Sequence, residues 1–296
     1  MKKFLGIDVG GGSVRGSVID KSGKLYHEDK IQTQIDWKNE EFLQALIGLV
    51  DKIIKVQMPD AIGIGTPGPI DMDLGTIIKS ANLSSLRNTP VVSSLKEKFN
   101  LPVYFNNDAN CAALGEYYFG KGKGSSNVIV LTLGTGLGCG WVYNGQIFNG
   151  YKGNGMESGH ITVIMHGAAC GCGKFGCAEA YFSATGLLNR YKDKTGEELK
   201  SAEEFFRKVS EKDDNCVKIL QFSTDVLAEL IRNLIHAVNP QKVIMVGGLT
   251  ASYNLFEERL VNRVKNIIWP VFKEYTEIMV GEKIAGSYGA AALCFE

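Results

Sequence analysis

One local plan occurs twice in the sequence: a short apolar run, a glycine-rich turn and a second apolar run. Residues 4–19 follow this plan around Gly10-Gly11-Gly12, and residues 128–143 repeat it around the segment 134–138. Each copy is typical of two strands joined by a tight turn. The repeat therefore predicts two related α/β lobes rather than one uniform domain.

Outside these two copies, the spacing of apolar residues alternates along the chain between the period of a helix and that of a strand. We expect helices over residues 38–57, 91–100, 109–118 and 217–238, and strands over 61–64, 103–105 and 243–246. The last helix has a predicted buried stripe of Ile219, Phe222, Val226, Leu230, Leu234, Ile235 and Val238. Strands joined by helices indicate a parallel or mixed sheet.

The segment Gly120–Gly124 alternates glycine with lysine, and its glycines make the backbone flexible. Such a segment suits a hinge between the two lobes. We therefore expect a small lobe over residues 1–118, completed by a C-terminal helix over 284–296. The large lobe is then expected over residues 119–283.

The composition excludes several classes of protein. Of 296 residues, 32 are Lys or Arg and 32 are Asp or Glu, so the formal net charge is +0. The chain therefore lacks the excess of positive charge that is typical of proteins binding nucleic acid or an anionic membrane. The N-terminus lacks the pattern of a signal peptide, and no apolar run is long enough to span a membrane. We expect a cytoplasmic protein with no membrane or nucleic-acid partner.

The first glycine turn is a candidate phosphate-binding loop. Its residues are Asp8, Gly10, Gly11, Gly12 and Ser13. Glycines let backbone N–H groups approach phosphate oxygens, Ser13 adds a hydroxyl donor, and a carboxylate at a strand end suits Mg²⁺. The same pattern also fits a plain glycine hairpin. It is neither a Walker A loop nor a Rossmann fingerprint, because Gly-Lys-[Ser/Thr] is missing and a strand follows instead of a helix.

Two further glycine segments could contact a nucleotide. The second loop offers Thr132, Gly134, Thr135 and Gly136, and two such loops can close on a polyphosphate from both sides. The pair Gly247-Gly248 follows an expected strand, where it either admits an adenine or ribose or forms a simple strand-to-helix turn.

The segment 170–177 is a candidate metal site. Cys170, Cys172 and Cys177 can surround one ion in tetrahedral geometry, with His160 or His166 as the fourth ligand. Free cysteines in a loop are the alternative. The remaining cysteines have apolar or helical neighbours and are expected in the core; they are Cys111, Cys139, Cys216 and Cys294.

Asp108 is a candidate general base, because it stands where an expected strand meets an expected helix. A carboxylate there, in a cleft between lobes, is well placed to take a proton from a hydroxyl. The same position equally suits a helix N-cap, for which Asp and Asn are both common.

Five motifs in this order resemble the ROK (repressor, open reading frame, kinase) family of bacterial sugar kinases, close to its glucokinases. They are Asp8-x-Gly10-Gly11, the run 107–116 (Asn-Asp-Ala-Asn-x-Ala-Ala-x-Gly-Glu), Gly134-Thr135-Gly136-x-Gly138, Glu157-x-Gly159-His160 and the cysteine segment through Glu179. The resemblance runs nearly from end to end.

This resemblance implies an actin-like ATPase fold of the hexokinase and ribonuclease H type, with the active site in a cleft between two lobes. It implies ATP- and Mg²⁺-dependent phosphorylation of a hexose, with glucose favoured and Asp108 as the general base. The residues matching sugar contacts are Gly68, Asn82, Asn107, Glu157, His160 and Glu179. Those matching ligands of a structural Zn²⁺ are His160, Cys170, Cys172 and Cys177. Family members are often homodimers or homotetramers.

Three positions depart from the family pattern. Gly12 replaces the usual Thr, which removes a hydroxyl that would face phosphate. Gly155-Met156 stands where Ala-Gly is common, and Leu86 stands where many relatives have Trp. Retention of Glu157 favours glucose, since the family's N-acetylmannosamine kinases often lack that carboxylate.

Other functions fit the resemblance less well. Kinases for N-acetylglucosamine, fructose, mannose or allose are the nearest alternatives, and a non-catalytic sugar-binding protein is a third. The family's repressors carry an N-terminal helix-turn-helix domain, for which a phosphate loop beginning at Asp8 leaves no room.

Overall fold

The structure is a computed structural model that describes residues 1–34, 36–80, 83, 85–282, 284 and 286–295. The chain divides into two compact units. Unit 1 consists of Met1–Gly124, Gly140–Met156 and Glu282–Glu296, and unit 2 consists of Ser125–Cys139 and Glu157–Gly281. Within the described residues, no helix combines the length and apolar character needed to cross a membrane.

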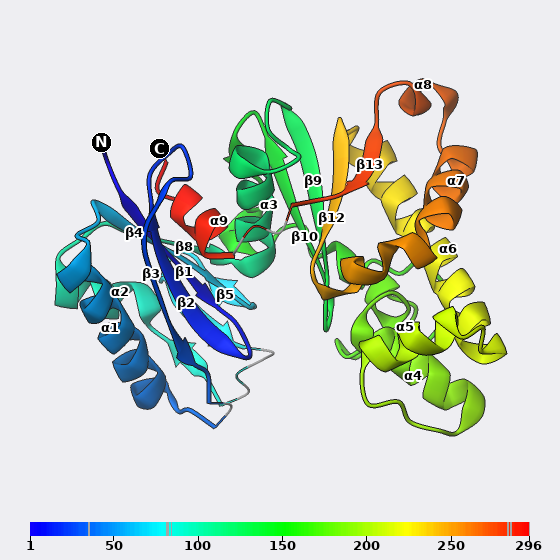
Figure 1. Cartoon of the computed structure of the whole chain (residues 1–296), viewed down its shortest axis with the longest axis horizontal. Helices are drawn as coiled ribbons and strands as arrows, with labels where there is room; N and C mark the ends of the chain where they lie inside the picture. The colour runs from blue at the N-terminus through cyan, green and yellow to red at the C-terminus, as the bar shows by residue number, and fades with distance from the viewer. Residues whose placement is uncertain (35, 81–82, 84, 283, 285, 296) are drawn as a thin grey trace. The chain divides into compact units, whose positions relative to one another are not determined.

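Unit 1 is built on a five-stranded sheet in the order β3-β2-β1-β4-β8 (Figure 1). Its strands are β1 (Phe4–Val9), β2 (Ser13–Ile19), β3 (Leu25–Gln32), β4 (Ala61–Thr66) and β8 (Val103–Asn107). Strands β1, β4 and β8 run parallel, whereas β2 is antiparallel to β1 and β3. All six residues of β4 are buried, as expected for a strand covered on both faces.

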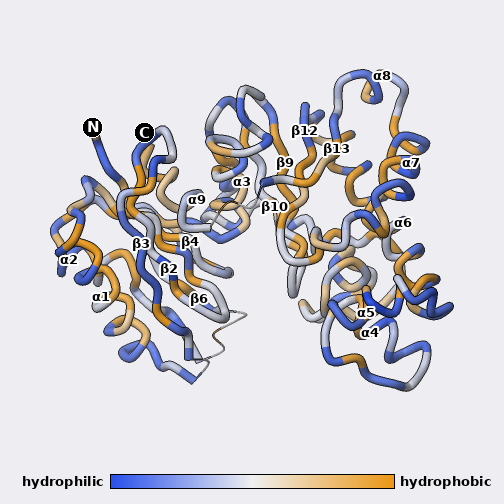
Figure 2. Tube along the Cα trace, viewed as in Figure 1, coloured by the Kyte–Doolittle hydropathy of each residue, from blue (hydrophilic) through white to orange (hydrophobic). Residues whose placement is uncertain are grey.

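Strand β3 was not predicted from the sequence. It is the edge of the sheet, carries the charged residues Glu28, Asp29 and Lys30 at its centre, and is largely hydrophilic in Figure 2. Charged side chains on an edge strand discourage pairing with another chain. They also remove the apolar signal by which a strand is recognised.

Helices cover both faces of this sheet. They are α1 (Asn39–Val56), α2 (Val91–Phe99), α3 (Asp108–Phe119) and α9 (Gly286–Ala292). Gly16, paired with Ile7, faces Ile53 of α1, whereas the neighbouring Gly6 faces Ser287 of α9. Because adjacent strand residues point to opposite faces, α1 and α9 lie on opposite sides of the sheet. Helix α2 contacts α1, and α3 contacts α9.

The C-terminal helix α9 lies unusually close to the sheet. A Cβ atom on Gly6 would lie 1.7 Å from the carbonyl oxygen of Ser287, and one on Gly63 would lie 1.9 Å from that of Ala290. Only glycine allows this approach. Gly6 and Gly63 thus allow α9 to pack directly against β1 and β4.

A second five-stranded sheet has the order β11-β10-β9-β12-β13. Its strands are β9 (Asn127–Leu133), β10 (Leu137–Tyr143), β11 (Gln146–Ile147), β12 (Lys242–Val246) and β13 (Glu277–Val280). Strands β9, β12 and β13 run parallel. A small antiparallel sheet contains β5 (Ile70–Asp71), β6 (Thr76–Lys79) and β7 (Arg87–Thr89).

Unit 2 contains the longest helix, α6, whose start is capped by the Asp213 side chain and whose end is marked by Asn239 in the left-handed conformation. Its helices are α4 (Ala184–Thr195), α5 (Ala202–Ser210), α6 (Asp214–Val238), α7 (Glu257–Ile267) and α8 (Pro270–Lys273). Unit 2 also contains the 3₁₀ segments η2 (Ser158–His160), η3 (Ala178–Ala180) and η4 (Gly248–Leu255), whereas the 3₁₀ segment η1 (Tyr151–Gly153) belongs to unit 1.

The predicted helices and strands are confirmed, as is the repeated plan of two strands around a glycine turn, now β1–β2 and β9–β10. Five members of the predicted stripe of α6 are buried, whereas Val238 is partly buried and Phe222 is exposed. Phe222 is 51% exposed, although its spacing matches that of the buried residues.

Candidate functional site

In unit 1, the carboxyl ends of three parallel strands bring candidate residues together. The register pairs Asp8 of β1 with Gly65 of β4, and pairs Thr66 at the end of β4 with Asn107 of β8. The loop with Gly68 therefore leaves the sheet beside Asp8 on one side and Asn107-Asp108 on the other. The carboxyl edge of parallel strands is where ligands bind in open α/β sheets.

The two interpretations of Asp108 can now be separated. The N-cap of α3 is Asn107, whose Oδ1 accepts a hydrogen bond from the N–H of Asn110 at 2.7 Å. Asp108 is the first helical residue and is exposed, and its carboxylate accepts the N–H of Ala109 at 2.8 Å and interacts with its own backbone N–H. The capping function thus belongs to Asn107, which leaves the Asp108 carboxylate turned toward solvent.

The pKa values of Asp8 and Asp108 are both raised, and Asp108 contributes to the shift of Asp8. Desolvation by surrounding protein, then repulsion from Asp108, raises the pKa of Asp8 to about 6, with Arg15 opposing the shift. Desolvation also raises the pKa of Asp108, although its side chain reaches solvent, and the N–H of Ala109 opposes that shift. Two carboxyl groups with raised pKa values in one place are a common sign of a functional site.

The first glycine loop is a tight connection between β1 and β2. The N–H of Gly10 donates to the carbonyl of Ser13 at 3.0 Å, and Thr33 holds the loop through bonds to the carbonyls of Gly10 and Gly12. Gly12 is exposed, and a Cβ atom there would meet nothing within 4 Å. The loop has the hairpin form, and its backbone remains open to a ligand at Gly12.

The predicted sugar contacts in this unit are placed only in part. Asn82 lies outside the described residues. The loop after Gly68 is held by Asn154, whose side chain bonds both the N–H and the carbonyl of Ile70. Leu86 is fully buried in the hydrophobic core of unit 1, so it contributes packing.

An asparagine network behind Asn107 was not predicted. Oδ1 of Asn106 accepts bonds from the N–H of Asn107 and from the side chain of Asn110, and its own amide donates to Asn149, each at 2.8 Å. These bonds fix the end of β8 relative to the start of α3. Asn106 could have been noticed beside Asn107, but nothing near Asn149 in the sequence marks it.

In unit 2, the second glycine loop lies beside Gly247. The register pairs Thr132 of β9 with Val246 of β12, so both segments leave the sheet at the same edge. Gly247 has φ +101°, and a Cβ atom there would lie 2.5 Å from the carbonyl oxygen of Leu133. Gly247 is therefore required by both its backbone conformation and this close approach.

The loop 134–136 also abuts the start of α4. The N–H of Ala184 donates to the carbonyl of Gly134 at 2.9 Å, and the N–H of Thr185 donates to that of Thr135 at 3.3 Å. Thr135 is exposed. The N–H of Gly134 donates to the carbonyl of Gly136 at 3.0 Å, so the exposed side chain of Thr135 is the group of the loop that faces solvent.

Glu179 connects this loop to the cysteine segment. One carboxylate oxygen accepts the N–H of Leu137 at 2.9 Å, and the other lies 3.8 Å from Nδ1 of His160 and 3.7 Å from Sγ of Cys170. Glu157 precedes η2, and its carbonyl accepts the N–H of His160 at 3.0 Å. Glu179 and His160, predicted together from the resemblance, are thus neighbours.

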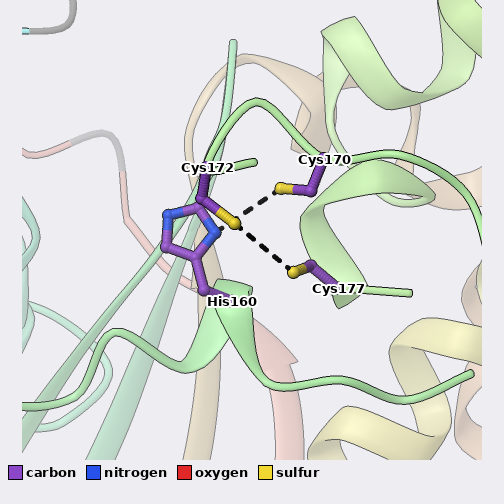
Figure 3. Close-up of side chains that lie close together, drawn as sticks. All are labelled: His160, Cys170, Cys172 and Cys177. Carbon is purple, nitrogen blue, oxygen red and sulfur yellow. Dashed lines mark hydrogen bonds between the residues drawn. The ribbon is translucent and has the colours of Figure 1, made fainter. Parts of the chain in front are cut away.

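Four side chains form a compact cluster that could hold a metal ion (Figure 3). One donor atom from each of His160, Cys170, Cys172 and Cys177 lies within 4.8 Å of the others. The Sγ atoms of Cys172 and Cys177 are 3.7 Å apart, and Sγ of Cys170 is 3.6 Å from Nδ1 of His160. A tetrahedral zinc site with ordinary bond lengths needs separations of about 3.8 Å between two sulfurs and about 3.5 Å between sulfur and nitrogen. The donor set fits such an ion.

The structure distinguishes between the two histidines considered as a fourth ligand. His160 is in the cluster, whereas His166 is exposed with φ +56° and is not part of it. The other cysteines are all buried, as predicted for core residues; they are Cys111, Cys139, Cys216 and Cys294.

Met156 has φ +60°, a left-handed conformation that favours glycine. This is the position where the family commonly has glycine. Met156→Gly is therefore expected to be about 1 kcal/mol more stable than Met156→Ala, because alanine keeps the unfavourable Cβ. Urea unfolding of the two variants measures the difference in free energy of unfolding. An alanine variant as stable as the glycine variant would show that the backbone is not strained there.

The comparisons with known proteins agree on one family. A sequence model of the ROK family matches residues 4–296. A glucokinase of Thermotoga maritima is 30% identical over 309 residues, covering 99% of this chain and 98% of that protein. An N-acetyl-D-glucosamine kinase of Histophilus somni is 31% identical over 266 residues, covering 86% of each.

Solved structures are similar to this chain over nearly its whole length and come from the same family. A ROK family glucokinase from Streptomyces griseus, in complex with glucose and AMPPNP, has a TM-score of 0.81 and 27% identity, with 98% of both chains covered. The chain thus has the actin-like ATPase fold of the ROK sugar kinases. It belongs to the ROK family.

Proposed function

We propose that this ROK-family sugar kinase transfers the γ-phosphoryl group of ATP to a hydroxyl of a hexose, most favourably glucose. The observation that carries the proposal is the position of Asp108, beside Asp8 at the carboxyl edge of β1, β4 and β8, with its carboxylate not used for capping. In this proposal the small lobe is residues 1–118 completed by 284–296, and the large lobe is residues 119–283.

Asp108 is the proposed general base. As the sugar hydroxyl oxygen bonds to the γ-phosphorus, the bond from that phosphorus to the bridging oxygen breaks, ADP leaves, and the hydroxyl proton passes to the Asp108 carboxylate. Phosphoryl transfer depends mainly on positioning and on stabilisation of charge, so the base must be held accurately. Asn107, as the N-cap of α3, and the bonds of Asn106 behind it hold the start of the helix that bears Asp108.

The two glycine loops are the proposed phosphate contacts. The loop residues proposed to contact the phosphates are Gly10, Gly11, Gly12 and Ser13 in unit 1, and Thr132, Gly134, Thr135 and Gly136 in unit 2. The N–H groups of Gly10 and Gly134 bond to carbonyls within their own loops, so the proposed donors are other backbone N–H groups of the loops and the hydroxyls of Ser13 and Thr135. Gly247 and Gly248 are proposed to admit the nucleoside. Asp8 would hold Mg²⁺, which neutralises charge on the phosphates when it is bound; ionised carboxylates are ligands it prefers.

Gly12→Thr tests the first loop. The added side chain has free space and the hydroxyl can donate to phosphate, so the KM for ATP is expected to fall about tenfold. Gly12→Val is the matched control, because it has nearly the shape of threonine without the hydroxyl. Steady-state kinetics at saturating sugar measure both. Equal KM values for ATP in the two variants would show that residue 12 does not contact the phosphates.

The proposed sugar contacts are Gly68, Asn82, Asn107, Glu157, His160 and Glu179. Support for His160 and Glu179 comes from their position beside the cysteine cluster, which would hold a structural Zn²⁺ through His160 Nδ1 and three thiolates. The ion, when bound, cross-links the loop mechanically. In this proposal, phosphoryl transfer itself is catalysed by Asp108, Asp8 and the two phosphate loops, and the zinc site takes no part in it.

The proposal is tested by ADP release with glucose, N-acetylglucosamine, mannose, fructose and allose in turn. Glucose is expected to have the highest kcat/KM. A higher value for N-acetylglucosamine would reassign the sugar and keep the reaction. ADP release that no sugar increases, with the protein folded by circular dichroism, would overturn the kinase proposal.

A further inference from the structure

The segment 149–155 of unit 1 (the 149–155 loop) contains none of the residues proposed to contact ATP or sugar. It follows β11 and includes η1. The N–H of Gly155 donates to the carbonyl of Asn149 at 2.8 Å, which closes the loop at its two ends. Contacts made by one end are therefore tied to contacts made by the other.

The first end of the loop completes a ring of three asparagine side chains. Oδ1 of Asn149 accepts from the amide of Asn106 at 2.8 Å and from that of Asn110 at 3.5 Å. The Asn110 amide also donates to Oδ1 of Asn106 at 2.8 Å. Asn106 and Asn110 are buried, whereas Asn149 is half-buried. Since buried amide groups need partners, the Asn149 oxygen is an acceptor that this ring depends on.

The asparagine ring holds the residue that precedes Asp108. Oδ1 of Asn106 accepts the N–H of Asn107 at 2.8 Å, and the N–H of Asn110 donates to Oδ1 of Asn107 at 2.7 Å. Asn107 is thus bonded to two members of the ring, and Asp108 follows it as the first residue of α3. The start of the helix that bears Asp108 is therefore held in place with respect to Asn149.

The second end of the loop holds the segment that follows Gly68. The side chain of Asn154 accepts the N–H of Ile70 at 3.2 Å and donates to the carbonyl of Ile70 at 2.9 Å. Next to Asn154, a Cβ atom on Gly153 would lie 2.3 Å from Cγ of Met72, so the backbone packs closely against the end of β5. Ile70 begins β5 two residues after Gly68.

We propose that Asn149 and Asn154 are positioning residues for phosphoryl transfer. Asn149 fixes the start of the helix that bears the proposed base, Asp108, and Asn154 fixes the segment that bears Gly68, a proposed sugar contact. Because both asparagines belong to one closed loop, the base and the sugar contact are held at a set separation, as accurate transfer requires. This assignment rests on the sugar kinase proposal, since it gives both residues a part in that reaction.

The two asparagines should affect different kinetic constants. Asn149→Ala frees the start of α3, so kcat is expected to fall about tenfold while the KM for the sugar stays within about twofold. Asn154→Ala frees the segment after Gly68, so the KM for the sugar is expected to rise about tenfold while kcat stays within about threefold. A loop that only stabilised the fold would change both constants alike in the two variants. Steady-state kinetics with varied sugar at saturating ATP measure the difference.

A conservative variant and a matched control complete the test. Asn149→Asp keeps an oxygen that accepts from both amides, so its kcat should return to within about threefold of the starting value. Asn127→Ala is the control, because the Asn127 amide also joins two segments by donating to the carbonyls of Val238 and Asn239, at 2.8 and 3.0 Å. Asn127 begins β9, at the opposite end of the strand from the proposed phosphate loop. Its variant should leave both constants within about twofold.

Hydrogen exchange at the Asn107 amide gives a measurement that does not depend on turnover. It should be faster in Asn149→Ala than in the unsubstituted chain, and unchanged in Asn127→Ala. Asn149 and Asn154 are half-buried, so their variants are expected to fold, which circular dichroism checks. Asn149→Ser, whose side chain is polar but too short to reach Asn106, is a second variant and should show the same loss of kcat.

Full kcat in Asn149→Ala, equal loss in Asn149→Ala and Asn149→Asp, or the same changes in kcat and KM in both alanine variants would overturn the inference. An unchanged exchange rate at Asn107 in Asn149→Ala would also overturn it, and would leave the sugar kinase proposal untouched. ADP release that no sugar increases in the unsubstituted chain would instead overturn the sugar kinase proposal, and this assignment with it.

Discussion

Replacing Asp108 with alanine is expected to lower kcat about 10²-fold or more while sugar binding stays largely intact. The carboxylate is the proposed proton acceptor, and the helix that bears it keeps its cap, because the cap is Asn107. Stopped-assay kinetics and calorimetric titration of the sugar measure the two quantities separately. Asp108→Asn should show the same loss, since the amide has the shape of the carboxylate but cannot accept the proton.

A matched control is available on another helix. Asp214 is the first residue of α6, directly after the capping Asp213, just as Asp108 follows Asn107. Asp214→Ala removes a carboxylate from the same helical position and should leave kcat within about twofold, as expected for an exposed residue that is not among the proposed ATP or sugar contacts. A turnover near the starting value in Asp108→Ala would mean that another group is the base.

The pH profile gives a second measurement of the same residue. The pKa of Asp108 is raised, and that of Asp8 is raised to about 6. Both groups act as ionised carboxylates, so the rate should fall as the pH is lowered through these raised values. The acid limb should therefore appear at higher pH than the ordinary range of Asp. An acid limb near pH 4 would contradict the electrostatics of the site.

The parts of the site that could be predicted from the sequence depend on local signals. Asp8 lies near the end of one short apolar run, and Asn107 and Asp108 follow another. Because parallel strands end at the same edge of a sheet, these runs alone predict that the three residues lie at one edge. The cysteine cluster was predicted because its three thiols are close in sequence. Residue spacing alone allowed both His160 and His166 as the fourth ligand, whereas the family resemblance selected His160, which lies in the cluster.

The parts that could not be predicted depend on contacts between distant segments or on backbone conformation. Asn149 joins Asn106 across 43 positions of sequence, and no local pattern marks it. Phe222 has the spacing of a buried residue, yet no described part of the chain packs over one side of it and its ring is half exposed beside Tyr181. Met156 was noticed only as an expected departure from the family pattern, and the structure adds that its left-handed φ of +60° favours glycine.

Cys172→Ser is expected to remove bound zinc from the protein and to loosen the loop around residues 160–177. Cys172 is exposed, so the substitution disturbs little packing, and its thiolate is one of four donors within 4.8 Å of one another. Loss of one donor weakens a structural zinc site severely, because binding of the ion and ordering of the loop share one free energy. Elemental analysis should change from one zinc per chain to none, and amides of the loop should exchange faster with solvent.

The consequences for activity follow from Glu179, which reaches both the cluster and the second glycine loop. Its carboxylate lies 3.7 Å from Cys170 and 2.9 Å from the N–H of Leu137, so a loosened loop displaces a proposed sugar contact and a phosphate loop together. We expect kcat/KM to fall about 10- to 100-fold, the range seen when groups supporting a metal site are removed. His166→Asn is the control, because asparagine tolerates its left-handed backbone and His166 is not in the cluster. It should keep both zinc and activity, and retention of one zinc per chain in Cys172→Ser would show that the cluster does not hold the ion.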